Sequence, residues 1–323
     1  MVRLFFCCLS ITLLLTAARL ADAQQPATLK RVGFLNPAGS PSANVQSFYR
    51  GMRELGYIDG QNITIDFRTG SNLKELTDLA AELVRQKVDV IVASGPAVPV
   101  ARAVTNSVPI IFAFSGDPIE AGFIDSLARP GRNMTGITWL AFELVGKRLE
   151  ILKEAAPRVT RVAILASPAH AGEQRELRET RKSADTLKIT LLHNHVKDGA
   201  DVNAALEAAV KKNANALLVF PDPVTNAHRK QITEFAVKRR LPTMFGRKEP
   251  VEGGGLLSYG PILEEVYRRI PVHVDKVLKG TNPADIPTEL PMAFEFVINL
   301  KTAKQIGLTI PQWTLMKADG VIK

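Results

Sequence analysis

The sequence predicts an α/β protein made of two doubly wound parallel-sheet lobes that are joined by a hinge of several strands. Short apolar runs alternate with segments of helical periodicity along most of the chain, which is typical of βαβ units around a parallel sheet. The alternation runs through two cycles, and in each an apolar run stops at an Asp-Pro pair, at 117–118 and at 222–223. With 323 residues, 46% of them hydrophobic and 23% charged, the chain is long enough for one large or two ordinary domains.

The first cycle alternates strands with helices from residue 31 to residue 138. Its apolar runs and periodic segments predict strands at 31–35, 62–67, 88–92, 109–114 and 135–138, and helices at 43–55 and 73–86. The connections are short, so consecutive strands are expected to lie parallel in one sheet with helices on both faces.

The second cycle repeats this pattern and is followed by a few terminal elements. It predicts helices at 142–155, 173–187, 202–211 and 227–239, and strands at 161–165, 189–193, 216–220 and 242–245. A glycine-rich turn at 253–255 then leads into a strand, a helix at 262–279, an extended proline-containing segment and a strand at 294–298.

The terminal elements are too few to form a third domain, so we expect them to return to the two lobes. This predicts a signal peptide at 1–23, a first lobe formed by 24–140 with 262–290, and a second lobe formed by 141–261 with 291–323.

The N-terminal segment has the organisation of a secretory signal. Arg3 precedes an apolar stretch from Leu4 to about Ala18, and Ala21-Asp22-Ala23 has the small-x-small form of a cleavage site. Cleavage after about Ala23 predicts a periplasmic protein; an uncleaved anchor is the alternative. Both cysteines, Cys7 and Cys8, lie in this segment, so the mature chain would have none and would depend on its cores for stability.

Charge and motifs exclude several function classes. Loss of Arg3, Arg19 and Asp22 with the signal lowers the formal net charge from +9 to +8, and the basic residues alternate with acids at helical spacing, which argues against nucleic-acid binding.

There is no G-x-S-x-G elbow, phosphate loop, H-E-x-x-H helix or mature cysteine nucleophile, so neither catalysis nor a cofactor is predicted. His193 and His195 fall on one face of a possible strand, but no third ligand is near in sequence, so no metal site is predicted.

Small polar residues follow the predicted strands, where ligands bind in open α/β sheets. In the first lobe these are Asn36, Ser40, Ser94, Gly95, Pro96, Ser115 and Asp117; in the second they are Ser167, Asp222 and the pair Gly246-Arg247. Facing lobes would place both sets on one cleft, where Phe245 and Tyr259 could contact an apolar part of the ligand.

Asp117 and Asp222 have a second interpretation. Asp followed by Pro is a helix-start signal, because the carboxylate accepts hydrogen bonds from the first free amides and Pro suits the first helical position. Either residue could therefore cap a helix, contact a ligand or do both.

Four segments together resemble a known family over nearly the whole mature chain. They are GMRELGYIDGQNITIDFR from Gly51, SGDPIEAGFIDSLARPGRNMTG from Ser115, GGLLSYG from Gly254, and FVINLKTAKQIGLTIP from Phe296. In this order they resemble the substrate-binding proteins of ABC transporters that include binders of tryptophan and other aromatic amino acids. Glu120 stands where the D-P-x-x-A-G motif of that family usually has a small residue.

The resemblance implies a type I periplasmic-binding fold and a binding protein that is not an enzyme. It implies capture of a small molecule, such as an amino acid, between hinged lobes and delivery to an ABC permease in the inner membrane by a monomeric protein. A periplasmic subunit that senses a ligand for a membrane receptor is the alternative, because it would share the fold. The sequence does not name the ligand.

Overall fold

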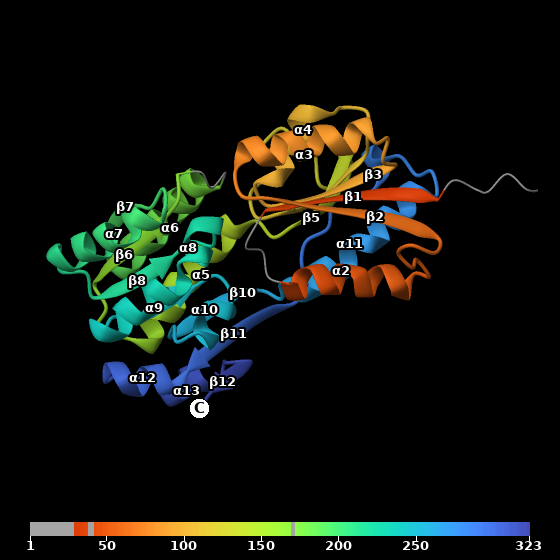
Figure 1. The fold of residues 1–323 in the computed structure, drawn as a ribbon. Helices are drawn as coiled ribbons and strands as arrows, with labels where there is room; N and C mark the ends of the chain where they lie inside the picture. Colours follow the sequence, from red (N-terminus) through yellow and green to blue (C-terminus); the bar gives the residue numbers. More distant parts are fainter. Residues whose placement is uncertain (1–28, 38–41, 169–171) are drawn as a thin grey trace, which may run out of the picture.

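The computed structural model describes residues 29–37, 42–168 and 172–323, and these form two α/β lobes (Figure 1). The predicted signal segment and Ser40 lie outside the described residues. Among the helices that are described, none has the length and apolar character needed to cross a membrane.

Lobe 1 is built on a five-stranded parallel sheet with the order β2-β1-β3-β4-β5. Its strands are β1 (Lys30–Pro37), β2 (Ile63–Gly70), β3 (Val90–Ser94), β4 (Ile110–Phe114) and β5 (Met134–Thr138). Strands β3, β4 and β5 are buried throughout, as expected for parallel strands covered on both faces.

Helices cover both faces of this sheet. One face packs on α3 (Leu73–Arg85) and α4 (Ala97–Val104), and the other on α2 (Ser42–Glu54) and α11 (Leu263–Leu278). Figure 1 shows α11, in blue, beside the red α2, although more than two hundred residues separate them. The short helix η2 (Pro283–Asp285) lies against β5. A late part of the chain therefore completes the core of the first lobe.

Lobe 2 contains a seven-stranded sheet with the order β12-β11-β10-β9-β8-β6-β7. Its strands are β6 (Arg161–Ala166), β7 (Thr190–His195), β8 (Ala216–Val219), β9 (Thr243–Phe245), β10 (Leu257–Pro261), β11 (Phe294–Asn299) and β12 (Gly320–Ile322). Strand β11 runs antiparallel to β10 and parallel to β12. The remaining neighbours are parallel, so the last strands extend a doubly wound sheet with a reversed edge.

The helices of lobe 2 also divide between the two sheet faces. They are α5 (Ala141–Ala155), α6 (Glu173–Leu187), α7 (Gly199–Lys211), α8 (Pro223–Ala227), α9 (Arg229–Lys238), α10 (Glu249–Glu252), α12 (Leu300–Ile306) and α13 (Gln312–Leu315). Apolar residues of α5, α6 and α12 form one core, and those of α7, α9 and α10 form the other. The predicted fold class is thereby confirmed: both lobes are α/β layers around largely parallel sheets.

The chain passes between the lobes at three places, and the three segments lie together. The first follows β5, the second is Ile262 and the third leads from Ile286 to Ala293. Thr138 N donates to Glu289 O at 3.0 Å, and Ile262 N donates to Ala293 O at 3.1 Å. These hydrogen bonds hold the three connections side by side between the lobes.

Candidate functional site

The carboxyl ends of strands from the two lobes face each other. The turn after β4 carries Asp117 and Glu120, and α6 of lobe 2 carries Arg175 in its first turns. The Arg175 guanidinium contacts the Asp117 carboxylate and lies 2.9 Å from Glu120 Oε2. These contacts join the edge of one sheet to the edge of the other, which is where open α/β sheets bind ligands.

Beside these carboxylates, lobe 1 carries a neutral, buried polar network at the ends of β1 and β3. Asn36 ends β1 and Ser94 ends β3, so the parallel sheet brings them together, and Ser94 Oγ donates to Asn36 Oδ1 at 2.5 Å. Tyr267 of α11 is buried next to Ser94, and burial raises the pKa of its hydroxyl. Gly95, with a φ of +52°, turns the chain so that Pro96 begins α4. Ser94 and Asn36 are thus paired, whereas Gly95 and Pro96 set the backbone.

Asp117 and Ser115 hold the end of β4 in place. Asp117 Oδ1 accepts from the amides of Ile119 and Glu120 at 2.8 and 3.3 Å, while its other oxygen contacts Arg175. The Ser115 carbonyl accepts from Ala141 N at 2.7 Å, which ties lobe 1 to the start of α5. Asp117 Oδ1 therefore caps a single turn, whereas Oδ2 contacts Arg175 of the other lobe.

Ser167 and Asp222 meet on the lobe 2 side. Asp222 is buried and precedes α8, where its Oδ1 accepts from Val224 N and Thr225 N at 2.8 and 2.9 Å. Ser167 N donates to Asp222 Oδ2 at 3.2 Å. Asp222 thus acts as a helix cap that also fixes the end of β6.

Phe245 and Tyr259 lie on opposite faces of the lobe 2 sheet. Phe245 belongs to the core formed with α7 and α9, while Tyr259 packs against the core formed with α5 and α6. Tyr259 also stacks on Phe294, with ring centroids 6.2 Å apart. Only Phe245 lines the small pocket beyond β8 and β9, together with Phe220, Pro221, Asn226, Gly246 and Arg247.

Two arginines give the lobe 2 side its positive charge. Arg247 borders this pocket, is partly exposed, and makes no hydrogen bond or ion pair with any residue that the structure describes. Its charge acts on Tyr267 of lobe 1 and on Arg148 of α5. Arg247 therefore lies where the two lobes meet, with a guanidinium available to a ligand.

Arg148 lies behind this surface and was not predicted from the sequence. It is 1% exposed, and its Nε donates to the Tyr259 carbonyl at 2.8 Å. Its two Nη atoms have no hydrogen-bond partner among the described residues. Burial lowers the pKa of Arg148 to about 10, whereas the charge of Glu176 in α6 acts in the opposite direction. The guanidinium remains charged at neutral pH, so it contributes a fixed positive charge below the cleft surface.

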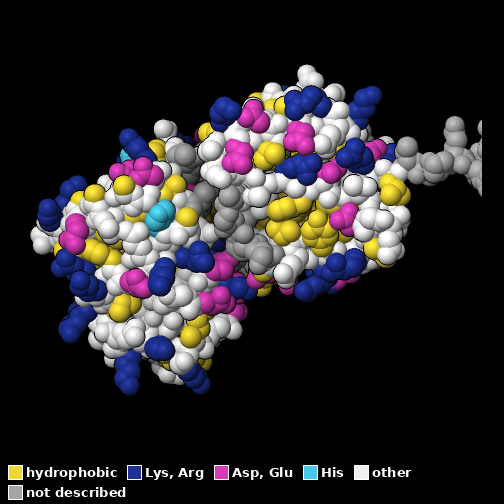
Figure 2. Space-filling view, in the orientation of Figure 1, with side chains coloured by type: hydrophobic (Ala, Val, Ile, Leu, Met, Phe, Trp, Pro, Cys, Tyr) yellow, Lys and Arg dark blue, Asp and Glu magenta, His cyan; other side chains and the backbone are white. Residues whose placement is uncertain are grey.

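Charge elsewhere on the molecule is mixed. On the face shown in Figure 2, Lys and Arg side chains are interspersed with Asp and Glu on both lobes. The acidic and basic groups at the junction are therefore a local feature. One further group of potential ligand atoms, Glu173 with His193 and His195, joins the first turn of α6 to β7.

Comparison with known proteins defines the class. The sequence matches the ABC transporter substrate binding protein family over residues 37–322, so the chain belongs to that family. It is 25% identical over 283 residues to a tyrosine-binding protein of Clostridioides difficile, covering 86% of this chain and 81% of that protein.

Two solved structures share the fold. One is an ABC domain from Streptococcus pneumoniae in complex with L-Trp, 24% identical, with a TM-score of 0.85. The other is the ligand-free, open structure of a substrate-binding protein with adhesive properties from Clostridium difficile, 23% identical, with a TM-score of 0.68. Each comparison covers 91% of this chain and all of the other. The fold is accordingly that of type I periplasmic-binding proteins.

Proposed function

We propose that this chain is the periplasmic substrate-binding component of an ABC importer. It captures a small molecule, an amino acid, between its lobes by hinge closure and delivers it unchanged to a permease in the inner membrane. The observation that carries the proposal is the junction between the lobes, where strand-end residues of both sheets meet, as the contacts of Arg175 with Asp117 and Glu120 show. The guanidinium of Arg247 follows β9 in lobe 2 and pairs with no described residue. The family membership supports the transport role.

The residues at the junction favour a ligand that carries a carboxylate. An arginine binds a carboxylate through two parallel hydrogen bonds, and the interaction is strong where water is excluded. The Asn36, Ser94 and Tyr267 network offers neutral polar atoms on the opposite wall. Phe220 and Phe245 supply an apolar side to the pocket. The names of two similar proteins, which refer to tyrosine and L-Trp, support an amino acid as the ligand.

Hinge closure is supported by the contacts between the lobes. The ion pairs of Arg175 with Asp117 and Glu120 form only when the two sheet edges approach each other. The higher TM-score against the L-Trp complex than against the open, ligand-free structure supports a closed arrangement here. We propose that residues 24–140 with 262–290 and residues 141–261 with 291–323 move as the two rigid bodies.

Thermal unfolding of the mature chain, from Gln24 onward, tests the function. The panel contains the amino acids, purines, small carboxylates and sugars, and each stabilising compound is recovered and checked for chemical change. An amino acid at a hundred times its dissociation constant is expected to stabilise the protein by about 2.7 kcal/mol. Stabilisation by sugars or purines alone would overturn the amino-acid assignment, and chemical turnover of the hit would overturn the binding role.

A partner experiment separates transport from sensing. The loaded protein is expected to stimulate ATP hydrolysis by a cognate permease reconstituted in vesicles. Association with a receptor and no effect on any such permease would instead establish the sensing subunit.

A further inference from the structure

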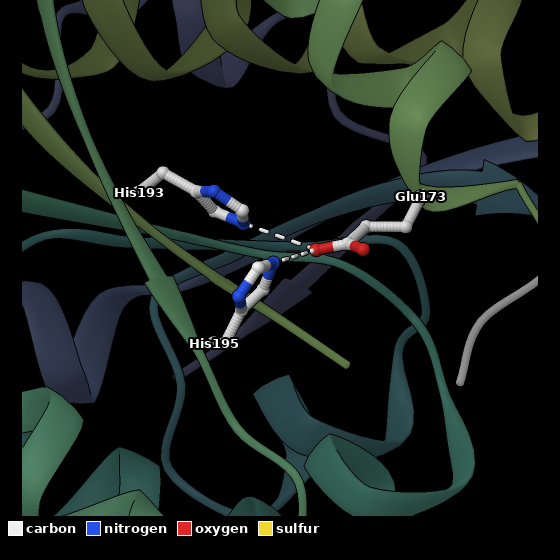
Figure 3. Close-up of side chains that lie close together, drawn as sticks. All are labelled: Glu173, His193 and His195. Carbon is white, nitrogen blue, oxygen red and sulfur yellow. Dashed lines mark hydrogen bonds and ion pairs between the residues drawn. The ribbon is translucent and has the colours of Figure 1, made fainter. Parts of the chain in front are cut away.

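Three potential metal ligands converge near the carboxyl end of β7 in lobe 2 (Figure 3). His193 and His195 are two residues apart on β7, the edge strand of the sheet, so their side chains leave the strand on the same face. Glu173 comes from the first turn of α6 and points between the two rings. The sequence alone predicted no metal site, because the third group lies twenty residues before the histidine pair.

The three side chains meet at a single carboxylate oxygen. Glu173 Oε1 lies 3.0 Å from His193 Nε2 and 2.9 Å from His195 Nε2. The two rings are nearly perpendicular, with centroids 4.2 Å apart. The three ligand atoms all lie within 4.8 Å of one another. In a tetrahedral zinc site with bonds of about 2.0–2.2 Å, ligand atoms are about 3.3 Å apart, so each Glu–His separation needs to widen by only a few tenths of an ångström.

The burial of the group also suits a metal ion. Glu173 is only 5% exposed, so its carboxylate is buried, whereas the His195 side chain is 50% exposed. A cation at this point would neutralise the buried carboxylate and keep one side open to water.

We propose that Glu173, His193 and His195 form a binding site for a divalent transition-metal ion of the zinc type, with water as the fourth ligand. Two imidazoles and one carboxylate are a ligand set that zinc accepts when it retains an open position. The site joins α6 to β7 and fixes the first turn of α6, from which Arg175 reaches lobe 1. Its three ligands are not among the residues proposed to contact the amino acid, so metal binding does not require the amino acid.

The test uses the mature chain without a histidine tag, stripped with a chelator and titrated with Zn²⁺ by calorimetry. Co²⁺ serves as a second probe, because tetrahedral coordination gives it intense visible absorption. We expect one Zn²⁺ per chain. His195→Asn should weaken binding by at least about tenfold, the lower bound for loss of even an outer-shell partner. Glu173→Gln should do the same.

His228→Asn is the matched control, because His228 is a single histidine in the same lobe that hydrogen-bonds to the Val224 carbonyl. It should bind Zn²⁺ like the unmodified protein. The proposal is overturned if the unmodified chain binds no Zn²⁺, if His195→Asn binds it equally well, or if His228→Asn loses as much affinity. Because the His195 side chain is half exposed, we expect His195→Asn to fold. It can therefore test the proposal even if Glu173→Gln does not fold.

Discussion

Among the described residues, each lobe fully buries one side chain that is basic in water, and this side chain is neutral in one lobe and charged in the other. His273 of α11 is fully buried in lobe 1, and burial lowers its pKa, so it is neutral at pH 7. Arg148 of α5 is buried to the same degree in lobe 2, but its pKa of about 10 leaves it charged. The buried base of lobe 1 is therefore neutral, whereas that of lobe 2 carries a fixed positive charge.

A similar contrast lies nearer the junction, between the neutral pair of Asn36 with Ser94 in lobe 1 and Arg148 and Arg247 in lobe 2. Neutral hydrogen-bonding groups orient a ligand without a large desolvation cost, whereas a fixed positive charge selects ligands by their sign. The two sets of residues can be altered one at a time, because they lie in different lobes.

The largest effect is expected from Arg148→Met, which removes the buried charge of lobe 2. The Tyr259 carbonyl would then lose the Arg148 Nε that donates to it at 2.8 Å. Loss of a hydrogen bond to a charged group typically costs about 1.5–3 kcal/mol, and we expect a loss of that order in the free energy of unfolding. Urea unfolding measures it.

Lys147→Met is the control for Arg148→Met. Lys147 is the preceding residue of the same helix, but its side chain is 48% exposed and Glu150 is its only ion-pair partner among the described residues. Its change should stay below about 1 kcal/mol. If both variants unfold at the same urea concentration, the buried guanidinium contributes nothing particular to lobe 2.

Arg247→Gln tests whether the exposed positive charge of lobe 2 binds the ligand. Hydrogen bonds to a charged group contribute about 1.5–3 kcal/mol, so affinity for a carboxylate ligand should fall by roughly ten- to a hundredfold. Stability should hardly change, because Arg247 has no ion pair with any described residue. Arg229→Gln makes the same charge change on the exposed start of α9 and should bind normally. Equal affinity in both variants would remove Arg247 from the site.

The pH dependence of stability tests the neutral state of His273. Because its pKa in the folded protein is below the ordinary value of 6.5, the unfolded chain takes up a proton first as the pH falls. The free energy of unfolding should therefore decrease below pH 6.5, by at most about 1.4 kcal/mol per pH unit, until the folded pKa is reached.

The variant His273→Gln isolates this contribution. Its unfolding free energy should vary less with pH than that of the unmodified protein between pH 6.5 and 5, even if it is lower throughout. Lys276, Arg269 and Glu289 surround the histidine and are unchanged in the variant. Identical slopes for the two proteins would show that His273 takes up its proton equally in both states.

The sequence predicted most of the fold because periodicity and burial are local signals. It missed α4, since Pro99 interrupts the pattern, although proline is tolerated in a first helical turn. It also placed a helix at 227–239, whereas the structure starts α8 at Pro223, where Asp222 and Thr225 form a capping box, and begins α9 separately at Arg229. After Asp117-Pro118 only one turn forms, and it ends at Gly122, whose φ is +70°.

The candidate site was less predictable. The positions after parallel strands follow from a general rule, and the structure brings Asn36 to Ser94 and Ser167 to Asp222. Tyr267, Arg148 and Glu173 come from helices, and what they contact depends on the packing of elements that are distant in sequence. No local pattern distinguishes such residues from the many polar residues on other helices.

The smallest effect is expected from Asp117→Asn, which weakens the contact between the lobes. Asparagine retains the oxygen that accepts from the Ile119 and Glu120 amides, so the turn should remain, but the charge that faces Arg175 is lost. A partly exposed ion pair contributes about 0.2–1 kcal/mol, so ligand affinity should fall by no more than about fivefold. Small-angle scattering of the ligand-free protein should show a larger mean radius.

Asp125→Asn is the matched control, because Asp125 pairs with Arg132 within lobe 1, at 3.0 Å, in the same stretch of chain. It removes an equal charge but no contact between the lobes, so affinity and radius should stay unchanged. If Asp125→Asn and Asp117→Asn behave alike, the effect is one of net charge. If only Asp117→Asn opens the molecule, the ion pair with Arg175 favours the closed form before the ligand arrives, and a fraction of the empty protein is already closed.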